Sequence, residues 1–391
     1  MQQPTATTVP GAVVPGVEVL LGDSLQLIRG KRVGLITNHS GRDRRGASTI
    51  DLLFHAPGVR LTALFGPEHG LRGVAQAGES VSTTTDSATG VPIYSLYGQT
   101  NAPTAEMLRN VDVLLYDIQD VGARVYTFEW TMALSAEAAG KFGKKFIVLD
   151  RPNPIRGDRF DGNILDPRFR SFVGEYPVAL RYGLTPGELL RYLVGTGQVQ
   201  ADIGVVPMRG WHRSMWWEET GIPWVNPSPN LRSVDATLLY PGTVFFEGTN
   251  ATEGRGTDKP FQLIGAEWLN DAGAIVREMN ALELPGVHFD STSRTIERGG
   301  GFKFEGRTIP MIDITVTNRN AVRPVDIGVR LLRAIYARHR TEWQWRASID
   351  RLAGTDELRA AVEQGTVDDL LARWSREADR FRDQAKRYFL Y

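Results

Sequence analysis

The 391-residue chain contains no cysteine and no surplus of charge of either sign. The lack of cysteine excludes disulfide bridges, thiol catalysis and cysteine-based zinc sites. The 45 basic residues are matched by 45 acidic residues, so the formal net charge is zero. A partner held mainly by charge requires a basic excess, and we therefore expect neither nucleic acid nor an anionic membrane surface as a partner.

Long apolar runs are also lacking. No stretch approaches the roughly 18 to 20 consecutive apolar residues that span a bilayer. Residues 1–15 have neither the basic nor the apolar region of a signal peptide, and we expect them to form a flexible leader. We expect a periplasmic or secreted protein if a signal has been removed from the chain, and a cytoplasmic protein otherwise.

Several motifs that hold cofactors or nucleophiles are missing. The chain has no Gly-x4-Gly-Lys-Ser/Thr phosphate loop, no Gly-x-Gly-x-x-Gly turn behind a strand and no Gly-x-Ser-x-Gly elbow of the kind that esterases use. Its six histidines include no His-x3-His pair of the type found in zinc enzymes. We therefore expect no nucleotide cofactor and no metal ion.

The first half of the chain repeatedly alternates short apolar strands with helical stretches. This alternation predicts an α/β fold, a Rossmann-like and mostly parallel sheet flanked by helices. The predicted strands are residues 32–37, 61–65, 92–96, 111–116, 146–149, 202–207 and 242–246. The predicted helices are residues 48–55, 105–109, 131–142 and 185–194. Residues 185–188, Thr-Pro-Gly-Glu, have the capping-box pattern of a helix start.

The pattern changes near residue 261. We predict a helix at 266–279, a strand pair near 301–304 and 312–316, and amphipathic helices from residue 325 onward. The charge-rich run 373–387 is typical of a solvated helix face. The predicted organisation is a leader (1–15), a Rossmann-like catalytic domain (16–260) and a smaller auxiliary α+β domain (261–391).

Residues 61–73, LTALFGPEHGLRG, combine a buried strand with a polar ending. Residues 61–65 are almost all apolar, as in a strand covered on both faces. Gly66-Pro67 ends the strand and is followed by Glu68, His69 and Arg72. Ligands of open parallel sheets bind beyond the carboxyl ends of the strands, so these residues are placed where a site is expected.

Three further strands end in polar residues of the same kinds, and one of them, at residues 146–149, runs into Asp150-Arg151-Pro152-Asn153-Pro154. The strand at 32–37 runs into Asn38, and the strand at 111–116 runs into Asp117, Gln119, Asp120 and Arg124. Each could be an ordinary turn, because Asn, Asp and Gly are common in turns. Their repetition at several strand ends favours a shared site at one edge of the sheet.

The third quarter supplies aromatic residues and a glycine-rich loop. Four tryptophans lie between residues 211 and 224, and their flat faces suit sugar rings, although we expect at least half of them to fill the core. Asn230 follows, and then the loop 247–257, which carries Glu247, Asn250, Glu253 and Arg255. Its three glycines allow the backbone to approach a ligand closely.

These motifs resemble, in the same order, those of the exo-β-N-acetylmuramidase family of glycoside hydrolases. The matching segments are GLITNHSG, FGPEHGLRG, TGVPIYSLYG, DIQDVGARVYT, LDRPNPIRG, YPVALRYGLTPGELLRYL, PWVNPSPN and EGTNATEGRGTDKPF. The resemblance covers nearly the whole chain. It implies an enzyme that removes N-acetylmuramic acid from the non-reducing end of peptidoglycan fragments, with a Rossmann-like domain and an auxiliary C-terminal domain.

Glycoside hydrolysis generally uses one protonated carboxyl group and a second carboxylate. Glu68 is our choice for one of them, and the resemblance points the same way. For the second, Asp117, Asp120, Glu175, Glu247 and Glu253 compete, and we select Asp120 and Glu253 as catalytic candidates. The lactyl carboxylate of muramic acid favours an arginine partner. The substrate-binding candidates are Asn38, His69, Arg72, Asp117, Gln119, Arg124, Asn230, Glu247, Asn250 and Arg255.

Other functions stay open at this point. The same cleft could bind a muropeptide without cleaving it, or could hydrolyse the glycoside of another aminosugar. An unrelated α/β enzyme such as an esterase is the weaker alternative, because the serine elbow is missing. The chain also departs from the family pattern at Asp161-Gly162-Asn163, where Glu-Gly-Pro is usual, and at Tyr182, where histidine is frequent. These departures imply slower action or a different aminosugar if the family residues have a role in the site.

Overall fold

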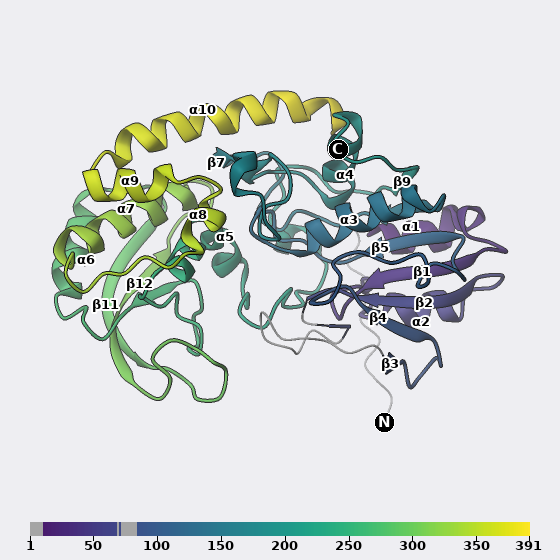
Figure 1. Ribbon diagram of the computed structural model, residues 1–391, viewed down its shortest axis with the longest axis horizontal. Helices are drawn as coiled ribbons and strands as arrows, with labels where there is room; N and C mark the ends of the chain where they lie inside the picture. Colours follow the sequence, from purple (N-terminus) through teal and green to yellow (C-terminus); the bar gives the residue numbers. More distant parts are fainter. Residues whose placement is uncertain (1–10, 69, 72–83) are drawn as a thin grey trace.

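The computed structural model of the protein describes residues 11–68, 70–71 and 84–391. Two lobes lie side by side, one formed by the first half of the chain and the other by the second half (Figure 1). The first lobe is built on a mostly parallel sheet and the second on a small antiparallel sheet. The expected fold class is therefore confirmed, whereas the domain boundary near residue 260 stays a prediction.

Within the described ranges, seven strands form the sheet of the N-terminal lobe, in the order β3-β4-β2-β1-β5-β6-β9. They are β1 (Arg32–Thr37), β2 (Arg60–Gly66), β3 (Thr84–Thr85), β4 (Pro92–Ser95), β5 (Val113–Asp117), β6 (Lys145–Leu149) and β9 (Ile203–Val206). Only the edge pair of β3 and β4 is antiparallel among these described strands. The order reverses at β1, next to β5, and such a switch point is where open α/β sheets bind ligands.

The strands alternate their side chains between two covered faces. On one face, Leu35 and Leu115 pack with helices α1 (Gly16–Asp23) and α2 (Thr49–Phe54). On the other face, Ile36 and Tyr116 pack with α3 (Phe128–Lys141) and α4 (Pro186–Gly195). Burial on both faces explains why these strands read as nearly continuous apolar runs in the sequence.

Local signals placed α4 correctly. Thr185 Oγ1 accepts a hydrogen bond from the Glu188 backbone N–H (3.2 Å), and Glu188 Oε2 accepts one from the Thr185 N–H (3.1 Å). This reciprocal pair is the predicted capping box. The rest of the lobe consists of the hairpin β7 (Asp161–Ile164) and β8 (Ala179–Arg181) and the short helices η1 (Leu25–Leu27), η2 (Pro167–Phe169) and η3 (Trp217–Thr220).

The expected leader is ordered over its last residues. Val13 is buried and its N–H donates to the Thr220 carbonyl (2.8 Å), and Val14 pairs with Arg209. Residues 1–10 lie outside the described ranges.

The C-terminal lobe packs helices on an antiparallel sheet with the order β10-β12-β11. Its strands are β10 (Leu263–Gly265), β11 (Val287–Thr295) and β12 (Thr308–Val316). Its helices are α5 (Val234–Thr243), η4 (Val244–Gly248), α6 (Ala272–Ala281), α7 (Pro324–Arg338), α8 (Ile349–Ala353), α9 (Glu357–Gln364), α10 (Val367–Ala385) and η5 (Lys386–Tyr388).

Three sequence-based assignments were wrong. Residues 242–246 end α5 and begin η4, because a short run of buried apolar residues reads alike in a helix and in a strand. Strand β12 pairs with β10 and β11 and not with residues 301–304, and β11 was not predicted because it is largely exposed and has a polar sequence. Residues 105–109 form turns, because so short a helix is not stable without packing.

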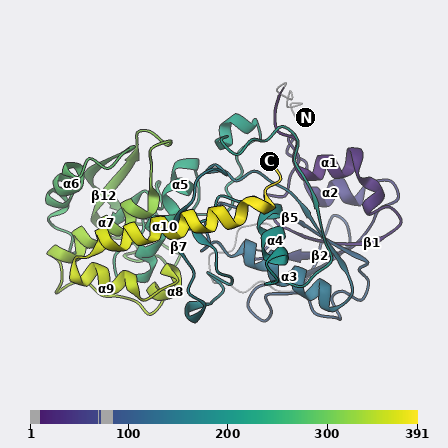
Figure 2. The same cartoon turned by 90° about the horizontal axis from the view of Figure 1, so that it is seen from above.

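Helix α10 crosses from one lobe to the other (Figures 1 and 2). Its buried stripe includes Trp374, Ala378 and Phe381, and it packs on α7 and α9 in one lobe and on β7 and β8 in the other. Its opposite face, which holds most of the charge-rich run, is exposed as predicted. The chain ends against the N-terminal lobe, where Tyr391 Oη donates to Asp150 (2.7 Å).

Candidate active site

A cavity of about 220 Å³ lies between the lobes. Glu68 reaches it from the end of β2, and Tyr126 and Thr127 reach it from the segment that precedes α3. Glu247 and Arg255 reach it from η4 and the loop that follows. The structure therefore brings four of the sequence-selected residues to one cavity: Glu68, Asn230, Glu247 and Arg255.

Glu68 is held firmly at the cavity. Its side chain is 8% exposed, and its Oε2 atom accepts a 2.6 Å hydrogen bond from Thr127 Oγ1. The backbone leaves β2 at Gly66, whose carbonyl accepts from the Leu96 N–H (2.8 Å). Glu68 is thus oriented both by its own strand and by the segment before α3.

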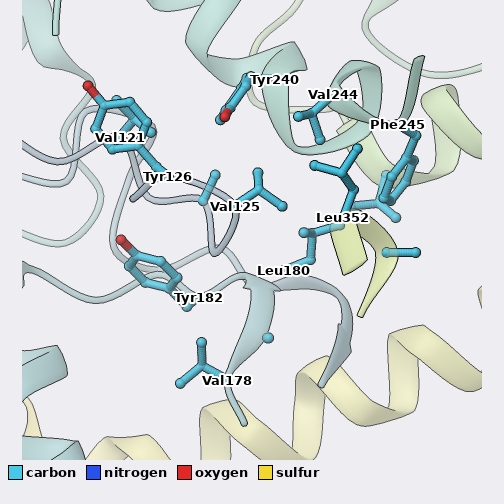
Figure 3. Packing of buried hydrophobic residues seen from close by; sticks show 14 of the residues in the cluster. Val121, Val125, Tyr126, Val178, Leu180, Tyr182, Tyr240, Val244, Phe245 and Leu352 are labelled. Carbon is cyan, nitrogen blue, oxygen red and sulfur yellow. The ribbon is translucent and has the colours of Figure 1, made fainter. Parts of the chain in front are cut away.

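Aromatic side chains line much of the cavity. The rings of Tyr126 and Tyr240 pack edge to face with their centroids 6.4 Å apart. The rings of Tyr240 and Phe261 pack in the same way, with their centroids 4.8 Å apart. Figure 3 shows that Val125 and Tyr126 of one lobe belong to the same buried cluster as Tyr240 and Val244 of the other. Burial raises the pKa of both tyrosines well above the usual value, so both hydroxyls stay protonated, and that of Tyr126 donates to the Pro227 carbonyl (2.8 Å). Sequence patterns did not single out these residues, because an isolated aromatic is read as core.

Four charged residues meet at the rim of the cavity. Arg255 lies between Glu247 (Nη2 to Oε1, 2.6 Å) and Glu253 (Nε to Oε1, 3.3 Å). Lys303 donates to Glu253 Oε2 (3.1 Å) and to the carbonyls of Phe246 and Ala251. Lys303 was missed by sequence reasoning because it lies about fifty residues beyond the loop that it braces.

The two glutamates of this cluster differ in their proton affinity. Burial raises the pKa of Glu247, and the neighbouring Glu253 adds to the rise, against the opposite effect of Arg255. Burial also disfavours the charge of Glu253, but Lys303 and Arg255 outweigh it and leave the pKa of Glu253 below its usual value. Carboxyl groups whose environments separate their pKa values are suited to acid and base roles.

Asp117 does not line this cavity. It is fully buried and forms a bidentate ion pair with Arg151, with Nε to Oδ1 at 2.5 Å and Nη2 to Oδ2 at 2.9 Å. Thr49 Oγ1 also donates to Asp117. The pair ties the end of β5 to the segment after β6, so the selection of Asp117 for substrate binding does not match its position.

Asp120 is also fully buried and does not line the cavity. Its Oδ2 atom accepts from Tyr182 Oη (2.5 Å) and from the Gly122 N–H (2.9 Å), and its other oxygen faces Glu129. The catalytic role expected for Asp120 lacks a route to the substrate, because the cavity surface is formed by the segment that follows it. Tyr182, one of the departures from the family pattern, serves here as the hydrogen-bond donor to Asp120.

Arg124 and Asn250 have structural positions. Arg124 donates to the carbonyls of Asn163 (2.8 Å), Val178 (3.1 Å) and Ala353 (2.7 Å) and has no exposed surface, and burial lowers its pKa to about 9. Asn250 exchanges hydrogen bonds with the backbone of Glu342 and Gln344. Both residues join distant segments, which a local sequence pattern cannot distinguish from a site.

Asn38 and Gln119 belong to neighbouring hollows. Asn38 Oδ1 accepts from Ser40, and the residue borders a wide cavity of about 490 Å³ between β1 and α2. Gln119 donates to the carbonyls of Asp120 and Pro152 beside a small apolar hollow. His69 and Arg72 lie outside the described residues.

The tryptophans of the third quarter mainly fill a core. Trp211 and Trp217 are buried with Val13 and Ile222, and Trp224 packs on Trp217 at 5.3 Å. The expectation that at least half of the four are core residues is confirmed. Aromatic contacts in the cavity come instead from tyrosines and phenylalanines of the two lobes.

Two kinds of feature are absent from the described part of the chain. No described helix has both the length and the apolar character needed to cross a membrane. No group of three or more His, Cys, Asp or Glu side chains in the described ranges is arranged to hold a metal ion.

Comparison with known proteins places the chain among peptidoglycan hydrolases. Residues 33–235 match the N-terminal domain of the exo-β-N-acetylmuramidase NamZ, and residues 238–391 match its C-terminal domain. The peptidoglycan β-N-acetylmuramidase NamZ of Bacillus subtilis (strain 168) is 43% identical over 382 residues, which are 97% of this chain and 91% of that protein.

Two solved structures have the same fold. Both are DUF1343 family proteins of Bacteroides fragilis NCTC 9343. One is 35% identical with a TM-score of 0.89 and covers 98% of this chain and 100% of its own. The other is 30% identical with a TM-score of 0.76 and covers 97% of this chain and 99% of its own. The two domain matches and the similarity to a characterised enzyme along nearly the whole length show that this chain belongs to the exo-β-N-acetylmuramidase family of glycoside hydrolases.

Proposed function

We propose that the cavity between the lobes binds a terminal N-acetylmuramic acid of a peptidoglycan fragment and that Glu68 and Glu247 cleave its glycosidic bond. The observation that carries this proposal is the presence of these two carboxyl groups on one cavity beside Arg255. A cavity of about 220 Å³ suits a chain end better than the interior of a polysaccharide. The mode of cleavage is therefore exo-acting.

Glu247 is suited to be the general acid. Its raised pKa favours the protonated form, and the proton passes to the glycosidic oxygen as the bond to the leaving sugar breaks. Glu68 is the second carboxyl group, acting on the anomeric carbon as nucleophile or on water as base. Water supplies the hydroxyl group of the released sugar. Glu253 was also selected as catalytic from the sequence. Its carboxylate forms ion pairs with Lys303 and Arg255, and its proposed role is to stabilise the charged cluster.

The charge of the cluster suits the lactyl carboxylate of muramic acid. When Glu247 holds its proton, two cations, Arg255 and Lys303, face the single carboxylate of Glu253. The surplus positive charge favours an anionic substituent on the sugar. Asn230 and the Tyr240 hydroxyl supply further hydrogen-bonding groups at the same cavity, whereas the Tyr126 hydroxyl already donates to the Pro227 carbonyl (2.8 Å). We therefore expect far slower action on the corresponding N-acetylglucosaminide, which lacks the lactyl group.

The first test replaces each carboxyl group by its amide. Glu68→Gln should fold and lose at least about a hundredfold in kcat on a nitrophenyl muramide, the lower range for loss of an acid or base group. Glu247→Gln should lose far more on a saccharide substrate than on the nitrophenyl muramide, because nitrophenolate departs without being protonated. Glu106→Gln is the matched control, since Glu106 is exposed and pairs with Arg109.

Wild-type turnover in Glu68→Gln would remove Glu68 from catalysis. Saturable binding of the muramide by the wild-type protein without any turnover would favour a muropeptide-binding module. Product analysis on a defined oligosaccharide tests the exo mode, since early fragments of intermediate length would contradict it. Equal rates on the muramide and the glucosaminide would contradict recognition of the lactyl group.

A further inference from the structure

A second cavity, of about 230 Å³, adjoins the first. Glu247 and Arg255 line both cavities and form the boundary between them. On the far side, the second cavity is lined by Glu253, Gly300, Gly301, Phe302, Lys303 and Arg346. All of these far-side residues belong to the C-terminal lobe.

The shared position of Glu247 decides what the second cavity can hold. A general acid must lie within hydrogen-bonding reach of the glycosidic oxygen, which joins the terminal sugar to the leaving sugar. If the terminal sugar occupies the first cavity, the bond that breaks crosses the boundary at Glu247. The next sugar of the substrate then enters the second cavity.

We propose that the second cavity is the subsite for the leaving-group saccharide and that Arg346 binds a carboxylate on that saccharide; this inference rests on the function proposed for the first cavity. Phe302 offers the partly exposed aromatic face on which sugar rings pack. Gly301 has no side chain, and no described atom lies within 4 Å of the place where its Cβ atom would be, so a sugar ring can approach the backbone there. The subsite thus takes an oligosaccharide that carries a carboxylate group beyond the cleaved bond.

The loop that forms this subsite is ordered by its own contacts. Glu305 accepts hydrogen bonds from the N–H groups of Gly299 (3.1 Å), Gly300 (2.9 Å) and Phe302 (2.7 Å). The backbone of Gly256 packs directly against the Phe302 ring. A Cβ atom at this position would lie only 2.6 Å from the ring, so a side chain has no room there. A loop that is already ordered loses little conformational entropy when it binds a ligand.

Arg346 is the cation of this cavity that is available to a ligand. Lys303 is held by Glu253 and two carbonyl groups, and Arg255 by Glu247 and Glu253. Arg346 has an exposed side chain and forms no ion pair within the described part of the chain. Its backbone is fixed, since its N–H donates to the Gly248 carbonyl (2.8 Å), and Gly248 directly follows Glu247 in the chain. The guanidinium group is therefore tethered close to the point of cleavage.

The test compares two substrates in the wild-type protein and three variants. One substrate is a nitrophenyl muramide, whose leaving group is small and carries no carboxylate, and the other is a peptidoglycan tetrasaccharide with a carboxylate beyond the cleaved bond. We expect Arg346→Ala to lower the ratio of kcat/KM for the tetrasaccharide to that for the muramide about fivefold, the upper range for a partly exposed ion pair. Arg346→Glu should lower the ratio further. Arg340→Ala is the matched control, since Arg340 is exposed, lies six positions away and does not line the cavity.

A tetrasaccharide whose carboxylates are converted to methyl esters completes the experiment. With the ester, wild type and Arg346→Ala should give the same ratio of rates. An unchanged ratio in both Arg346 variants, or an equal loss with the charged and the esterified substrate, would overturn the inference. Neither result would bear on the proposed function, which fails separately if the wild-type protein does not hydrolyse the muramide at all.

Discussion

Glu129 and Asp120 face each other beneath the candidate active site, and both are fully buried. As two anions they would repel, and neither Glu129 oxygen receives a hydrogen bond from another described residue. If one of them holds a proton, it donates to the other, and the repulsion between two anions is removed. Burial, followed by the charges of Asp120 and Asp150, raises the pKa of Glu129 well above its usual value, so Glu129 is the group that keeps the proton.

This pair supports the segment that carries Tyr126 and Thr127 to the cavity. Asp120 is bound by Tyr182 and the Gly122 N–H, and Glu129 lies in the first turn of α3, two positions after Thr127. Because Thr127 donates to Glu68, the protonated pair positions one of the proposed catalytic groups without touching the substrate. We regard Asp120 and Glu129 as positioning residues.

The proton on Glu129 predicts a pH dependence of stability. The folded protein keeps a proton that the unfolded chain releases near pH 4.5, so this contribution to stability is complete below that pH and declines as the pH rises toward the raised pKa. Glu129→Gln keeps a neutral hydrogen-bonding group and cannot titrate. The Tm of the variant minus that of wild type should therefore increase between pH 5 and pH 8, by about 3 °C.

Thermal unfolding of the two proteins at matched pH values measures this difference. Asp150 and Tyr116 face Glu129 in both proteins, so their own titrations largely cancel in the comparison. A Tm difference that is constant or that falls with pH would show that Glu129 is ionised in the folded protein.

At the scale of elements, the contact between α5 and α7 sets the position of Glu247. The helix backbones touch at two glycines: a Cβ atom at Gly242 would lie 1.9 Å from the Pro324 carbonyl oxygen, and one at Gly328 would lie 2.3 Å from the Gly242 carbonyl oxygen. Helix α5 leads directly into η4, which carries Glu247. The close approach of two helices therefore fixes the proposed general acid.

Gly242→Ala should destabilise the protein by about 2 kcal/mol, because the added methyl group has no space and must push the helices apart. It should also lower kcat, since η4 would move with α5. Gly273→Ala in α6 is the matched control, because the nearest atom to its Cβ lies 3.8 Å away. That change should be neutral or should stabilise by up to about 1 kcal/mol, the usual gain from alanine in a helix.

Denaturant unfolding and muramide hydrolysis would be measured for both variants. Equal stabilities of the two alanine variants would show that α5 and α7 can separate without cost. Full activity in a destabilised Gly242→Ala protein would show that the place of Glu247 does not depend on this contact.

At the scale of the whole molecule, α10 and the last residues of the chain hold the two lobes together. Tyr391 Oη donates to Asp150 (2.7 Å) and accepts from the Met208 N–H (2.8 Å), and the Leu390 N–H donates to Glu188 (2.8 Å). The guanidinium carbon of Arg213 lies over the Phe389 ring, 3.5 Å from the ring centroid. Because the cavity is formed by both lobes, these contacts also preserve its shape.

Tyr391→Phe should lower the free energy of unfolding by about 1 to 3 kcal/mol, because it leaves the buried Asp150 with one donor fewer. Tyr388→Phe is the matched control, since the Tyr388 hydroxyl makes no hydrogen bond with the described residues. Calorimetry should show one transition for wild type and for both variants, with only Tyr391→Phe shifted downward. Equal stability of the two variants would mean that the terminal hydroxyl is not part of the lobe contact.

The α/β sheet and the family could both be predicted from local sequence signals. Strands that are buried on both faces are apolar throughout, so a short stretch of sequence identifies them. The start of α4 depends on residues three positions apart, so it too can be predicted from a short stretch. The ordered motifs likewise indicated Glu68 and the loop 247–257, because each motif is a contiguous stretch of chain. Such signals require only neighbouring residues.

Which polar residues share a cavity was decided by tertiary packing. Asp117, Asp120 and Arg124 follow the same strand and have the same residue types as a site, yet their partners Arg151, Tyr182 and Ala353 lie elsewhere in the chain. Glu68 and Glu247 are 179 positions apart and meet only because α5 packs on α7 and α10 joins the lobes. Whether a carboxyl group binds substrate or supports the fold depends on burial and distant partners, and these are properties of the packed molecule.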